Sequence, residues 1–590
     1  MTVKERLTAL RLEMKKQDID IYVVPTCDFH GSEYLGDYFK TREYISGFTG
    51  SAGTVVVTEK KACLWTDGRY FVQAKKQLSD DYALMKEGQK GTPTIKEYIQ
   101  SFVEKSGEVA IGFDGRCMSA GMMEEIGRIK RTKIICSVDL IGKIWKDRPF
   151  LPCNKVWRLD EIYAGKTFAE KIRDIRKEMQ KRNCDVLVET ALDNIAWMLN
   201  LRGNDIECTP VFLAFLIVDK DETTLFVQKK AVDYQIEQYL KENRIKVRAY
   251  EEIYDDISKI ENKKVWIDYN SANYRIVSML EKNNKIYNQF TPTLLMKAVK
   301  NQVEISNMKK AHLLDGIAMT KFIYWLKTNV GKIPMDEIMI GEKLEYFRDM
   351  AESYIEPSFQ PIVGYKDHGA IVHYSATKES SYKVEADNIV LIDSGGHYLE
   401  GTTDVTRTIS LGNVTDKMKM MYTAVLKGHL NLTAAIFKAG CSGVSLDYLA
   451  RKPLWGMGMD YNHGTGHGVG YLLGVHESPN GIRYRILDNP ELNAPLKAGM
   501  ITSNEPGVYL ENEFGIRIEN LILCKEKEEN EYGEFLEFET LTLVPYDKEL
   551  IATEMLDDYE KELLEKYNNR VYKELKTYLS EEEGRWLLGE

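Results

Sequence analysis

Two distant segments of this chain carry the same pattern, and the repeat narrows the folds open to it. The stretch RLEMKKQDIDIYVV at 11–24 aligns with RKEMQKRNCDVLVE at 176–189, with Arg, Glu, Met, Lys, Asp and Val in register. Apolar residues at helical spacing occupy each copy. They are Val3, Leu7, Leu10 and Met14 in the first copy, and Phe168, Ile172, Ile175 and Met179 in the second. We expect two successive α/β domains of common ancestry.

Local signals around the repeat support this expectation. Each predicted helix opens with a capping box, from Thr2 to Glu5 and from Thr167 to Glu170. Each helix leads into a predicted strand, and further β-branched runs follow in both copies. The runs are IDIYVV, GTVVVT and ACLWTD in the first copy, and DVLVE, FLAFLIVD and TTLFV in the second. Helix and strand therefore alternate as an α/β domain requires.

The remaining organisation follows from breaks in these patterns. Pro149 and Pro152 mark a linker between the two copies. A long apolar helix face begins near Val303, and the turn-rich, β-branched segments after it indicate an α+β domain. The tail, rich in Glu, Lys and Leu, is predicted to be helical. We expect the domains to span 1–150, 151–302 and 303–545, followed by a helical extension over 546–590.

Composition excludes several classes of protein. The 590 residues carry a formal net charge of −11, with acidic and basic residues mixed along the chain, so nucleic acid and anionic membrane are not expected partners. Nine scattered cysteines without a CxxC pair are typical of reduced thiols. No apolar run approaches the ~20 residues that cross a bilayer. These features predict a soluble cytoplasmic protein.

The stretch HGTGHGVG at 463–470 places two histidines four residues apart. On a helix this spacing would direct both side chains to one metal, but four glycines in eight residues disfavour a helix by about 1 kcal/mol each. In an extended chain His463 and His467 would lie ~13 Å apart, too far to share an ion. One can be a ligand while the other reaches a neighbouring pocket; a glycine loop with incidental histidines is the alternative.

Four carboxylates stand in apolar strand contexts of the same region, where an unpaired charge is expensive. Asp393 ends the run NIVLID, and Asp404 lies in TTDVTRTISLG, which alternates like a returning strand. Glu505 precedes Pro506, which favours extended backbone. In GIRIENLIL the alternation places Glu519 on the same face as Arg517. A hairpin-like pairing would bring the two aspartates together.

Four acids with one or two histidines form an oxygen-rich ligand set for two divalent ions, most readily Mn²⁺, with Zn²⁺ or Co²⁺ as alternatives. Two such ions clamp a shared water and lower its pKa. The sequence DSGG also permits a serine hydrolase with Ser394 as nucleophile, but a serine triad has no use for four further acids. The other alternative is a non-catalytic protein with the same domains that binds peptides or acts as a scaffold. Such a protein would be expected to have lost some of the metal ligands.

The ordered motifs resemble the metallopeptidase family with the pita-bread fold, and within it the three-domain cytosolic Xaa-Pro aminopeptidases (aminopeptidase P). The motifs are AIVHYSAT, LIDSGG, TTDVTRT, HGTGHGVG, VHESP, NEPGVY and IRIEN, with SGFTGSAG, WTDGRYF, AWMLNLRG and EEEGRWLLGE elsewhere. The resemblance implies a pita-bread catalytic domain preceded by two related α/β domains. It spans nearly the whole chain.

The same resemblance implies roles for individual residues. Five would bind two metal ions: Asp393, Asp404, His467, Glu505 and Glu519, with Asp404 and Glu519 bridging. Catalytic roles fall to Glu505, as proton relay, and to His373 and His476, which would contact the substrate and the tetrahedral intermediate. Further substrate contacts would come from His463, His467, Arg517 and, from the first domain, Arg69. Orienting the bridging ligand Glu519 is the alternative role for Arg517.

The implied activity is hydrolysis of the N-terminal Xaa-Pro bond by a hydroxide activated by two metals. The imide bond before proline has no N–H, so a dedicated pocket is chemically reasonable. Peptides with proline in second position are the expected substrates, and a homodimer is the expected assembly. A prolidase-like Xaa-Pro dipeptidase is the alternative activity.

Overall fold

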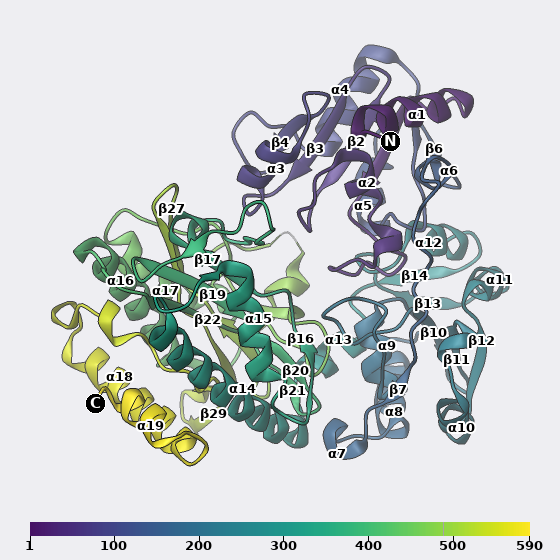
Figure 1. Cartoon of the computed structure of the whole chain (residues 1–590). Coiled ribbons are helices and arrows are strands. Elements are labelled where there is room, and N and C mark those ends of the chain that lie inside the picture. The colour runs from purple at the N-terminus through teal and green to yellow at the C-terminus, as the bar shows by residue number, and fades with distance from the viewer. Residues whose placement is uncertain (488) are drawn as a thin grey trace. The chain divides into compact units, whose positions relative to one another are not determined.

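The computed structural model describes residues 1–487 and 489–590. The chain divides into two compact units, drawn from purple to yellow along the sequence in Figure 1. The N-terminal unit comprises 1–159 and 166–293, and the C-terminal unit comprises 160–165 and 294–590. Each unit is described by itself below.

The N-terminal unit contains two six-stranded sheets of identical topology. The first has the order β4-β3-β2-β1-β5-β6. Its strands are β1 (Ile21–Pro25), β2 (Thr54–Thr58), β3 (Ala62–Thr66), β4 (Ala83–Lys86), β5 (Val109–Gly112) and β6 (Thr132–Ile135). The central strands β1, β2 and β3 pair antiparallel, while β4, β5 and β6 join the sheet by parallel pairing.

The second sheet repeats this plan strand for strand, in the order β12-β11-β10-β8-β13-β14. Its strands are β8 (Val186–Glu189), β10 (Ala214–Asp219), β11 (Thr223–Val227), β12 (Ile245–Ala249), β13 (Lys264–Ile267) and β14 (Lys285–Asn288). Antiparallel pairs join β8, β10 and β11, and parallel pairs join β12, β13 and β14. The predicted strands of both copies therefore occupy equivalent places in two related sheets.

The opening helices of the two copies form as their periodicity predicts. α1 (Val3–Lys16) and α8 (Phe168–Lys181) each begin with the complete capping box, in which Thr and Glu side chains satisfy the first backbone amides. The apolar stripe of each helix is buried, apart from Val3, which is partly buried, and that of α1 packs against the first sheet. The repeat in sequence is thus a repeat in structure.

The C-terminal unit is built on antiparallel sheets. A three-stranded sheet has the order β17-β19-β22, and a six-stranded sheet has the order β23-β30-β29-β26-β24-β25. The first consists of β17 (Ile362–Tyr365), β19 (Ile389–Ser394) and β22 (Val405–Ser410). The second consists of β23 (Ile436–Lys438), β24 (Gly466–Gly468), β25 (Glu477–Ile482), β26 (Ile501–Asn504), β29 (Asn520–Asn530) and β30 (Gly533–Thr540). The hairpin β27 (Gly507–Leu510) and β28 (Phe514–Arg517) connects β26 to β29 along the chain.

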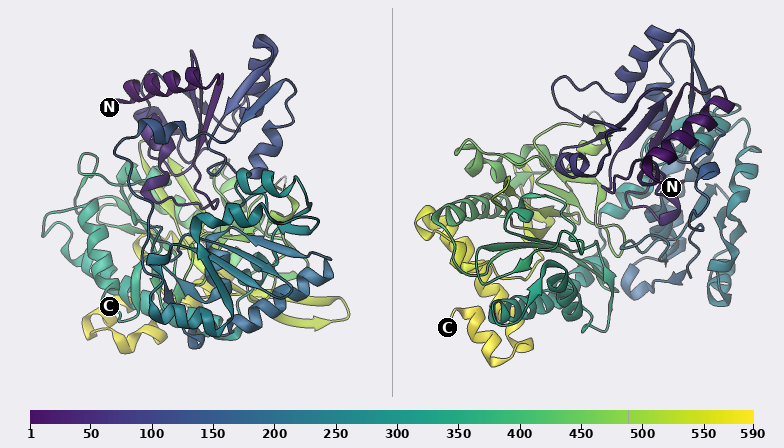
Figure 2. Two further views of the ribbon diagram at one scale, coloured as in Figure 1. Left: turned by 90° about the vertical axis from the view of Figure 1, so that its right-hand side faces the viewer. Right: turned by 45° about the horizontal axis from the view of Figure 1, so that its top comes forward.

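Helices cover these sheets. They are α14 (Gln302–Asn329), α15 (Glu337–Arg348), α16 (Asp416–Thr433), α17 (Asp447–Trp455), α18 (Asp558–Leu575) and α19 (Glu581–Leu588). The two C-terminal helices, yellow in Figure 2, pack against α14 and α16. Their apolar side chains complete a core that includes Ile516 and Ile518 of the β28 region. The C-terminal extension is therefore part of this unit's core.

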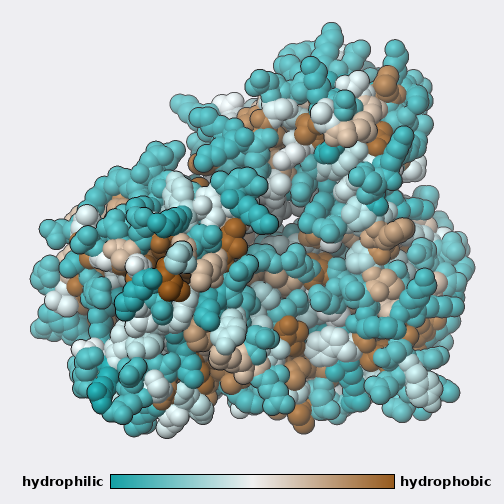
Figure 3. Space-filling view, viewed as in Figure 1, coloured by the Kyte–Doolittle hydropathy of each residue, from teal (hydrophilic) through white to brown (hydrophobic). Residues whose placement is uncertain are grey.

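Polar side chains predominate on the face drawn in Figure 3, with apolar ones scattered among them. Within the described part of the chain, no helix has the length and apolarity that a bilayer crossing requires.

Candidate metal centre

Two adjacent strands bring the first pair of predicted carboxylates together. β19 and β22 run antiparallel, with Asp393 opposite Thr406 and Ser394 opposite Val405. Asp404 immediately precedes β22, so it lies at the same end of the pair as Asp393. The intervening chain leaves the sheet and forms the short strands β20 (Gly396–Tyr398) and β21 (Gly401–Thr402). The predicted return of the strand is correct, with this excursion between its two arms.

The other predicted ligands arrive from the six-stranded sheet and its hairpin. His467 is the middle residue of β24, which pairs with β25 and β26. Glu505 follows β26, and its backbone N–H donates to Thr465 O at 2.8 Å. Glu519 follows β28, and its N–H donates to Thr406 O at 3.1 Å, which joins the two sheets at this point.

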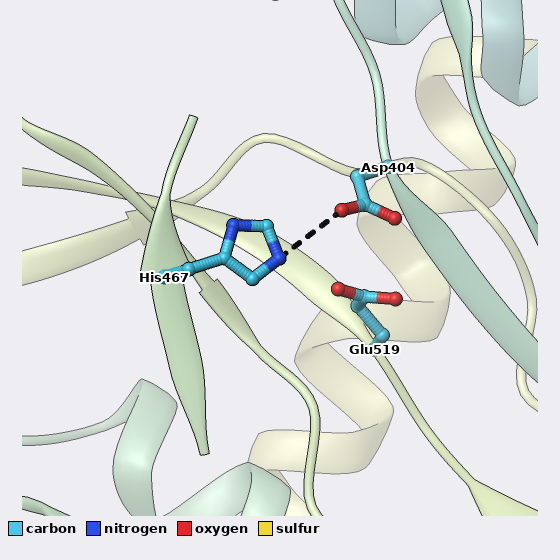
Figure 4. A group of neighbouring side chains, drawn as sticks. All are labelled: Asp404, His467 and Glu519. Atoms are coloured by element: carbon cyan, nitrogen blue, oxygen red, sulfur yellow. Dashed lines mark ion pairs between the residues drawn. The ribbon is translucent and has the colours of Figure 1, made fainter. Parts of the chain in front are cut away.

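These side chains converge in a small volume. Figure 4 shows His467, Asp404 and Glu519 pointing toward one another from separate strands. One potential ligand atom from each of the three lies within 4.8 Å of the others. His467 Nε2 is 3.5 Å from Asp404 Oδ2 and also 3.5 Å from Glu505 Oε1.

Hydrogen bonding selects the tautomer of His467. Its Nδ1 lies 2.9 Å from Gly468 O, and a carbonyl only accepts, so Nδ1 carries the proton. The lone pair is then on Nε2, the nitrogen that faces the carboxylates. This is the form in which histidine binds a metal, with the second nitrogen fixed by a backbone carbonyl.

Burial, reinforced by the crowding of like charges, raises the pKa values of the carboxylates. Burial, followed by the charges of Glu519, Asp393 and Glu505, raises the pKa of Asp404 well above its usual value. Burial and the charge of Glu519 raise the pKa of Glu505 in the same way. For Glu519, burial and Asp393 raise the pKa to about 8. The acids therefore stand where positive charge is needed to keep them all ionised.

Arg517 supplies part of that charge and orients one ligand. Its Nη2 donates to Asp393 Oδ2 at 2.6 Å, and its Nη1 donates to the Tyr509 hydroxyl at 2.8 Å. Asp393 Oδ1 is buried and has no hydrogen-bond partner among residues 1–487 and 489–590. One carboxylate oxygen is thus held by Arg517, and the other is available to a cation.

His463 lies beside this arrangement. Its Nδ1 is 2.8 Å from Gly464 O and its Nε2 is 2.8 Å from the Tyr509 hydroxyl, so Nδ1 donates and Nε2 accepts. Burial and the charge of Arg517 lower the pKa of His463 to about 3. The ring is therefore a neutral acceptor aimed at Tyr509, separate in role from His467.

The remaining predicted residues have different placements. The His476 ring stands edge-on to the His467 ring, with centroids 4.2 Å apart. His373 is close enough to His463 for its charge to lower the pKa of that residue. Arg69 belongs to the N-terminal unit, where its guanidinium makes a two-pronged hydrogen bond to Asp67 at 2.8 and 2.9 Å.

Three contributors were not predicted from the sequence. Tyr509 links His463 to Arg517, Thr406 donates to Glu519 Oε2 at 2.7 Å, and Ser503 accepts from His467 N at 3.0 Å. Strand alternation contains the signal for Tyr509, since its neighbour Val508 is buried in the core. The contacts of Thr406 and Ser503 depend on strand register, which alternation alone does not reveal.

The serine alternative finds no support in the contacts of Ser394. Its hydroxyl accepts from Arg348 Nη2 at 3.1 Å and lies 3.9 Å from Met319 Sδ. Neither neighbour is a general base, which a serine nucleophile needs.

The donor set fits divalent cations. Four carboxylates and one neutral imidazole nitrogen are hard or borderline ligands, and one buried carboxylate oxygen, Asp393 Oδ1, receives no hydrogen bond from the described part of the chain. Cations there would also favour the ionised carboxylates, whose pKa values are raised by burial and by mutual repulsion.

Comparison with known proteins agrees with this geometry. Residues 6–141 and 147–304 each match the Creatinase/Prolidase N-terminal domain. Residues 306–526 match metallopeptidase family M24, and residues 534–590 match the C-terminal region of M24 peptidases. The repeat found in the sequence corresponds to two matches to N-terminal domains of one kind.

Full-length relatives narrow the assignment. The chain is 39% identical to a probable Xaa-Pro aminopeptidase P of Neurospora crassa over 100% of its own length and 89% of the relative's. It is 38% identical to Xaa-Pro aminopeptidase 1 of Dictyostelium discoideum, covering 97% of this chain and 95% of that one.

A solved structure aligns over the same extent. The crystal structure of a Caenorhabditis elegans X-prolyl aminopeptidase, described as a cytosolic enzyme with a di-nuclear active site, superposes with a TM-score of 0.94 at 34% identity. The alignment covers 100% of this chain and 99% of that one. A prolidase from Pyrococcus horikoshii covers only 65% of this chain at 24% identity and shares the fold alone. The chain belongs to the Xaa-Pro aminopeptidases of metallopeptidase family M24, with two creatinase-type α/β domains preceding a pita-bread catalytic domain.

Proposed function

We propose that this chain removes the first residue from peptides that carry proline in second position, using two divalent cations. The observation that supports this most directly is the convergence of Asp404, His467 and Glu519, with Asp393 and Glu505 beside them. Full-length similarity to Xaa-Pro aminopeptidases supplies the substrate class. A dipeptidase of the prolidase kind remains the alternative that the experiment below distinguishes.

Charge balance supports two cations. Asp393, Asp404, Glu505 and Glu519 contribute four negative charges when ionised, and Arg517 returns one, which leaves three negative charges in a buried site. Two divalent ions offset this excess, whereas one would not. Manganese is the proposed metal because the set is mostly carboxylate oxygen, with zinc and cobalt as alternatives.

We assign the five ligand roles to Asp393, Asp404, His467, Glu505 and Glu519, with Asp404 and Glu519 bridging. When bound, the cations supply Lewis acidity, which lowers the pKa of water and polarises the scissile carbonyl. Arg517 holds one oxygen of Asp393, Thr406 holds one oxygen of Glu519, and Gly468 O fixes His467. Three of the five proposed ligands are thus oriented by contacts with other groups of the protein.

Proton transfer is assigned to residues at the edge of the cluster. Glu505 accepts a proton from the attacking water and returns it to the departing proline nitrogen. His476 and His373 donate hydrogen bonds to the oxygen on which negative charge develops. His463, held neutral by Tyr509, contacts the substrate, and Arg69 is a proposed further contact.

Other properties follow from the same assignment. The proposed domains remain 1–150, 151–302, 303–545 and 546–590, a division that the two equivalent sheets and the family matches support. We place the protein in the cytosol by similarity to the Caenorhabditis elegans enzyme, and a homodimer is the proposed assembly. Sedimentation or light scattering of the purified protein measures the assembly.

The decisive experiment compares three peptides on metal-stripped protein reloaded with Mn²⁺. We expect cleavage of Arg-Pro-Pro after the first residue, slow cleavage of Arg-Pro, and none of Arg-Ala-Ala. Activity on Arg-Pro alone would assign a dipeptidase, and activity on Arg-Ala-Ala alone would overturn the proline preference. Metal analysis of the loaded protein should give two ions per chain.

The matched control is Asp404→Asn, which keeps the shape of the side chain and removes one ligand charge. We expect bound metal to fall below two ions per chain and activity on Arg-Pro-Pro to fall by about 10²-fold or more, the range seen when a group that stabilises the transition state is lost. Full activity of this variant at wild-type metal content would remove Asp404 from the ligand set.

A further inference from the structure

A fully buried ion pair on α17 lies outside the roles assigned so far. Arg451 Nε donates to Asp447 Oδ2 at 2.7 Å, and both side chains are 0% exposed. Burying two charges carries a desolvation penalty of several kcal/mol per ion. The attraction within an isolated ion pair offsets this penalty only when further hydrogen bonds satisfy the remaining polar atoms. The partners of those further hydrogen bonds indicate what the pair is for.

We call residues 463–470, HGTGHGVG, the glycine-histidine loop. Every further hydrogen bond of the ion pair goes to this loop or to the residues directly before it. Arg451 Nη1 donates to Tyr461 O at 2.8 Å and to Asp460 at 2.6 Å, and Nη2 donates to His463 O at 2.8 Å. The second oxygen of Asp447 accepts from the Thr465 hydroxyl at 2.5 Å. The Tyr461 ring also covers the guanidinium at 3.8 Å. One helix thus holds three alternate residues, 461, 463 and 465, of a single segment.

This part of the loop lacks a strand ladder to hold it. β24 begins only at Gly466, so residues 461–465 precede the paired region, and Gly464 within them adds backbone freedom. His467 is fixed independently by its pairing opposite Gly481 and by Ser503. The two histidines of the loop therefore depend on different supports.

The held segment reaches the metal centre by two routes. His463 accepts from Tyr509, which in turn accepts from Arg517, the partner of Asp393. Thr465 O accepts the backbone N–H of Glu505. A displacement of residues 463–465 would move a substrate contact and the backbone of a proton-transfer residue, while the β24 pairing keeps His467 in place.

We propose that Asp447 and Arg451 are positioning residues for the reaction, which fix His463 and Thr465 relative to the metal ligands by gripping the loop from α17. The proposal rests on the proposed function for its catalytic readout. If the proposal is correct, changing Asp447 or Arg451 lowers the turnover of peptide without changing the amount of bound metal.

The test uses full-length holoenzyme and the variants Arg451→Lys, Arg451→Met and Thr465→Val. Arg451→Met removes every hydrogen bond of the guanidinium, whereas lysine retains the charge but not the planar fork that reaches several carbonyls at once. Thr465→Val removes the hydroxyl that donates to Asp447 and lies 2.5 Å from the Tyr461 hydroxyl, while the side chain keeps its shape. It provides a second test if the methionine variant does not fold. The readouts are kcat and KM on Arg-Pro-Pro and metal content.

We expect Arg451→Met to lower kcat/KM at least tenfold, Thr465→Val to lower it severalfold, and Arg451→Lys to recover part of the loss, all at two ions per chain. Unchanged kcat/KM in Arg451→Met and Thr465→Val would overturn the proposal. Loss of metal in proportion to activity would also overturn it, because the pair would then support the ligands in general.

A control separates positioning from general stability. Lys427 on α16 forms a largely buried ion pair with Glu560 on α18, and neither helix contributes a residue to the loop. Lys427→Met should lower the melting temperature without changing kcat/KM. An equal loss of kcat/KM in this variant would show that any broken buried pair has the same effect, against the proposal.

Hydrogen exchange tests the positioning role of Asp447 and Arg451 independently of the proposed peptidase function. We expect the amides of residues 461–466 to exchange faster in Arg451→Met than in wild type, with those of β26 unchanged, whichever peptide is cleaved. Wild-type protein that cleaves none of the peptides would refute the proposed function alone, whereas equal exchange in both proteins would refute the grip on the loop.

Discussion

At the scale of single residues, chemistry depends on partners that sequence patterns do not specify. The four acids were predicted because apolar strands rarely carry such side chains without a use, and His467 was predicted because its motif resembles that of a known family. Their mutual approach is found in the structure, but the tautomer of His467 and the orientation of Asp393 come from Gly468 O and Arg517. Tyr509 was not predicted because tyrosine is common in strands, and only the structure shows that its hydroxyl contacts His463 and Arg517.

A second residue-scale case lies in the N-terminal unit and makes a prediction. Glu189 is fully buried at the end of β8, where burial raises its pKa to about 7 despite a 2.7 Å hydrogen bond from Thr291. The native state holds this proton between pH 4.5 and about 7, whereas the unfolded chain releases it, so stability falls as pH rises through that window.

Glu189→Gln should therefore stabilise the protein at pH 8 by on the order of 3 kcal/mol relative to its effect at pH 4.5. Thermal melts at the two pH values measure the difference. Glu242→Gln, at an exposed position of α10 (Tyr234–Glu242), is the control and should show no such dependence. A Glu189→Gln melting curve that shifts equally at both pH values would contradict the assignment.

At the scale of elements, periodicity predicted individual helices and strands, which depend on local sequence. It did not predict the order of strands in the sheets, which depends on pairing between distant segments. The strands of both repeats and the capped helices α1 and α8 were predicted because alternation, helical spacing and capping boxes are local. The excursion through β20 and β21 and the order of the six-stranded sheet were not, since both depend on contacts between distant segments. The role of α17 was missed for the same reason.

The C-terminal helix α18 gives a prediction at this scale. The Tyr567 hydroxyl donates to Val544 O at 2.8 Å and accepts from Arg407 Nη2 at 3.2 Å, and Arg407 Nη1 donates to Glu519 O at 2.7 Å. Tyr567→Phe leaves buried groups with fewer partners and should lower the free energy of unfolding by about 1–3 kcal/mol. Urea unfolding measures this.

Tyr559 is on the same helix and 56% exposed, so Tyr559→Phe is the matched control and should change stability little. Equal unfolding midpoints for the two variants would exclude a structural role for the Tyr567 hydroxyl.

At the scale of the whole molecule, the chain consists of two units with separate cores. The sequence predicted the α/β and α+β classes of these parts because each has its own periodicity. It did not predict that residues 160–165 join the C-terminal unit, where Asn301 Nδ2 donates to Ala164 O at 3.0 Å. A short segment carries too little pattern to reveal its packing partner.

This division predicts how metal affects unfolding. Ions that bind only the folded C-terminal unit stabilise it by about 2.7 kcal/mol at a hundredfold excess over Kd. Calorimetry with and without Mn²⁺ should move the transition of this unit and leave that of the N-terminal unit in place. Asp404→Asn should abolish the shift, whereas Glu189→Gln should move only the other transition.

The centre is assembled from strands that begin at residue 389 and end beyond residue 519, and its hairpin packs on a core that α18 and α19 complete. A chain cut short by a premature stop codon before Glu519 would lack one proposed metal ligand and both helices that complete the core beneath the hairpin. We therefore expect such a truncated chain to cleave no peptide.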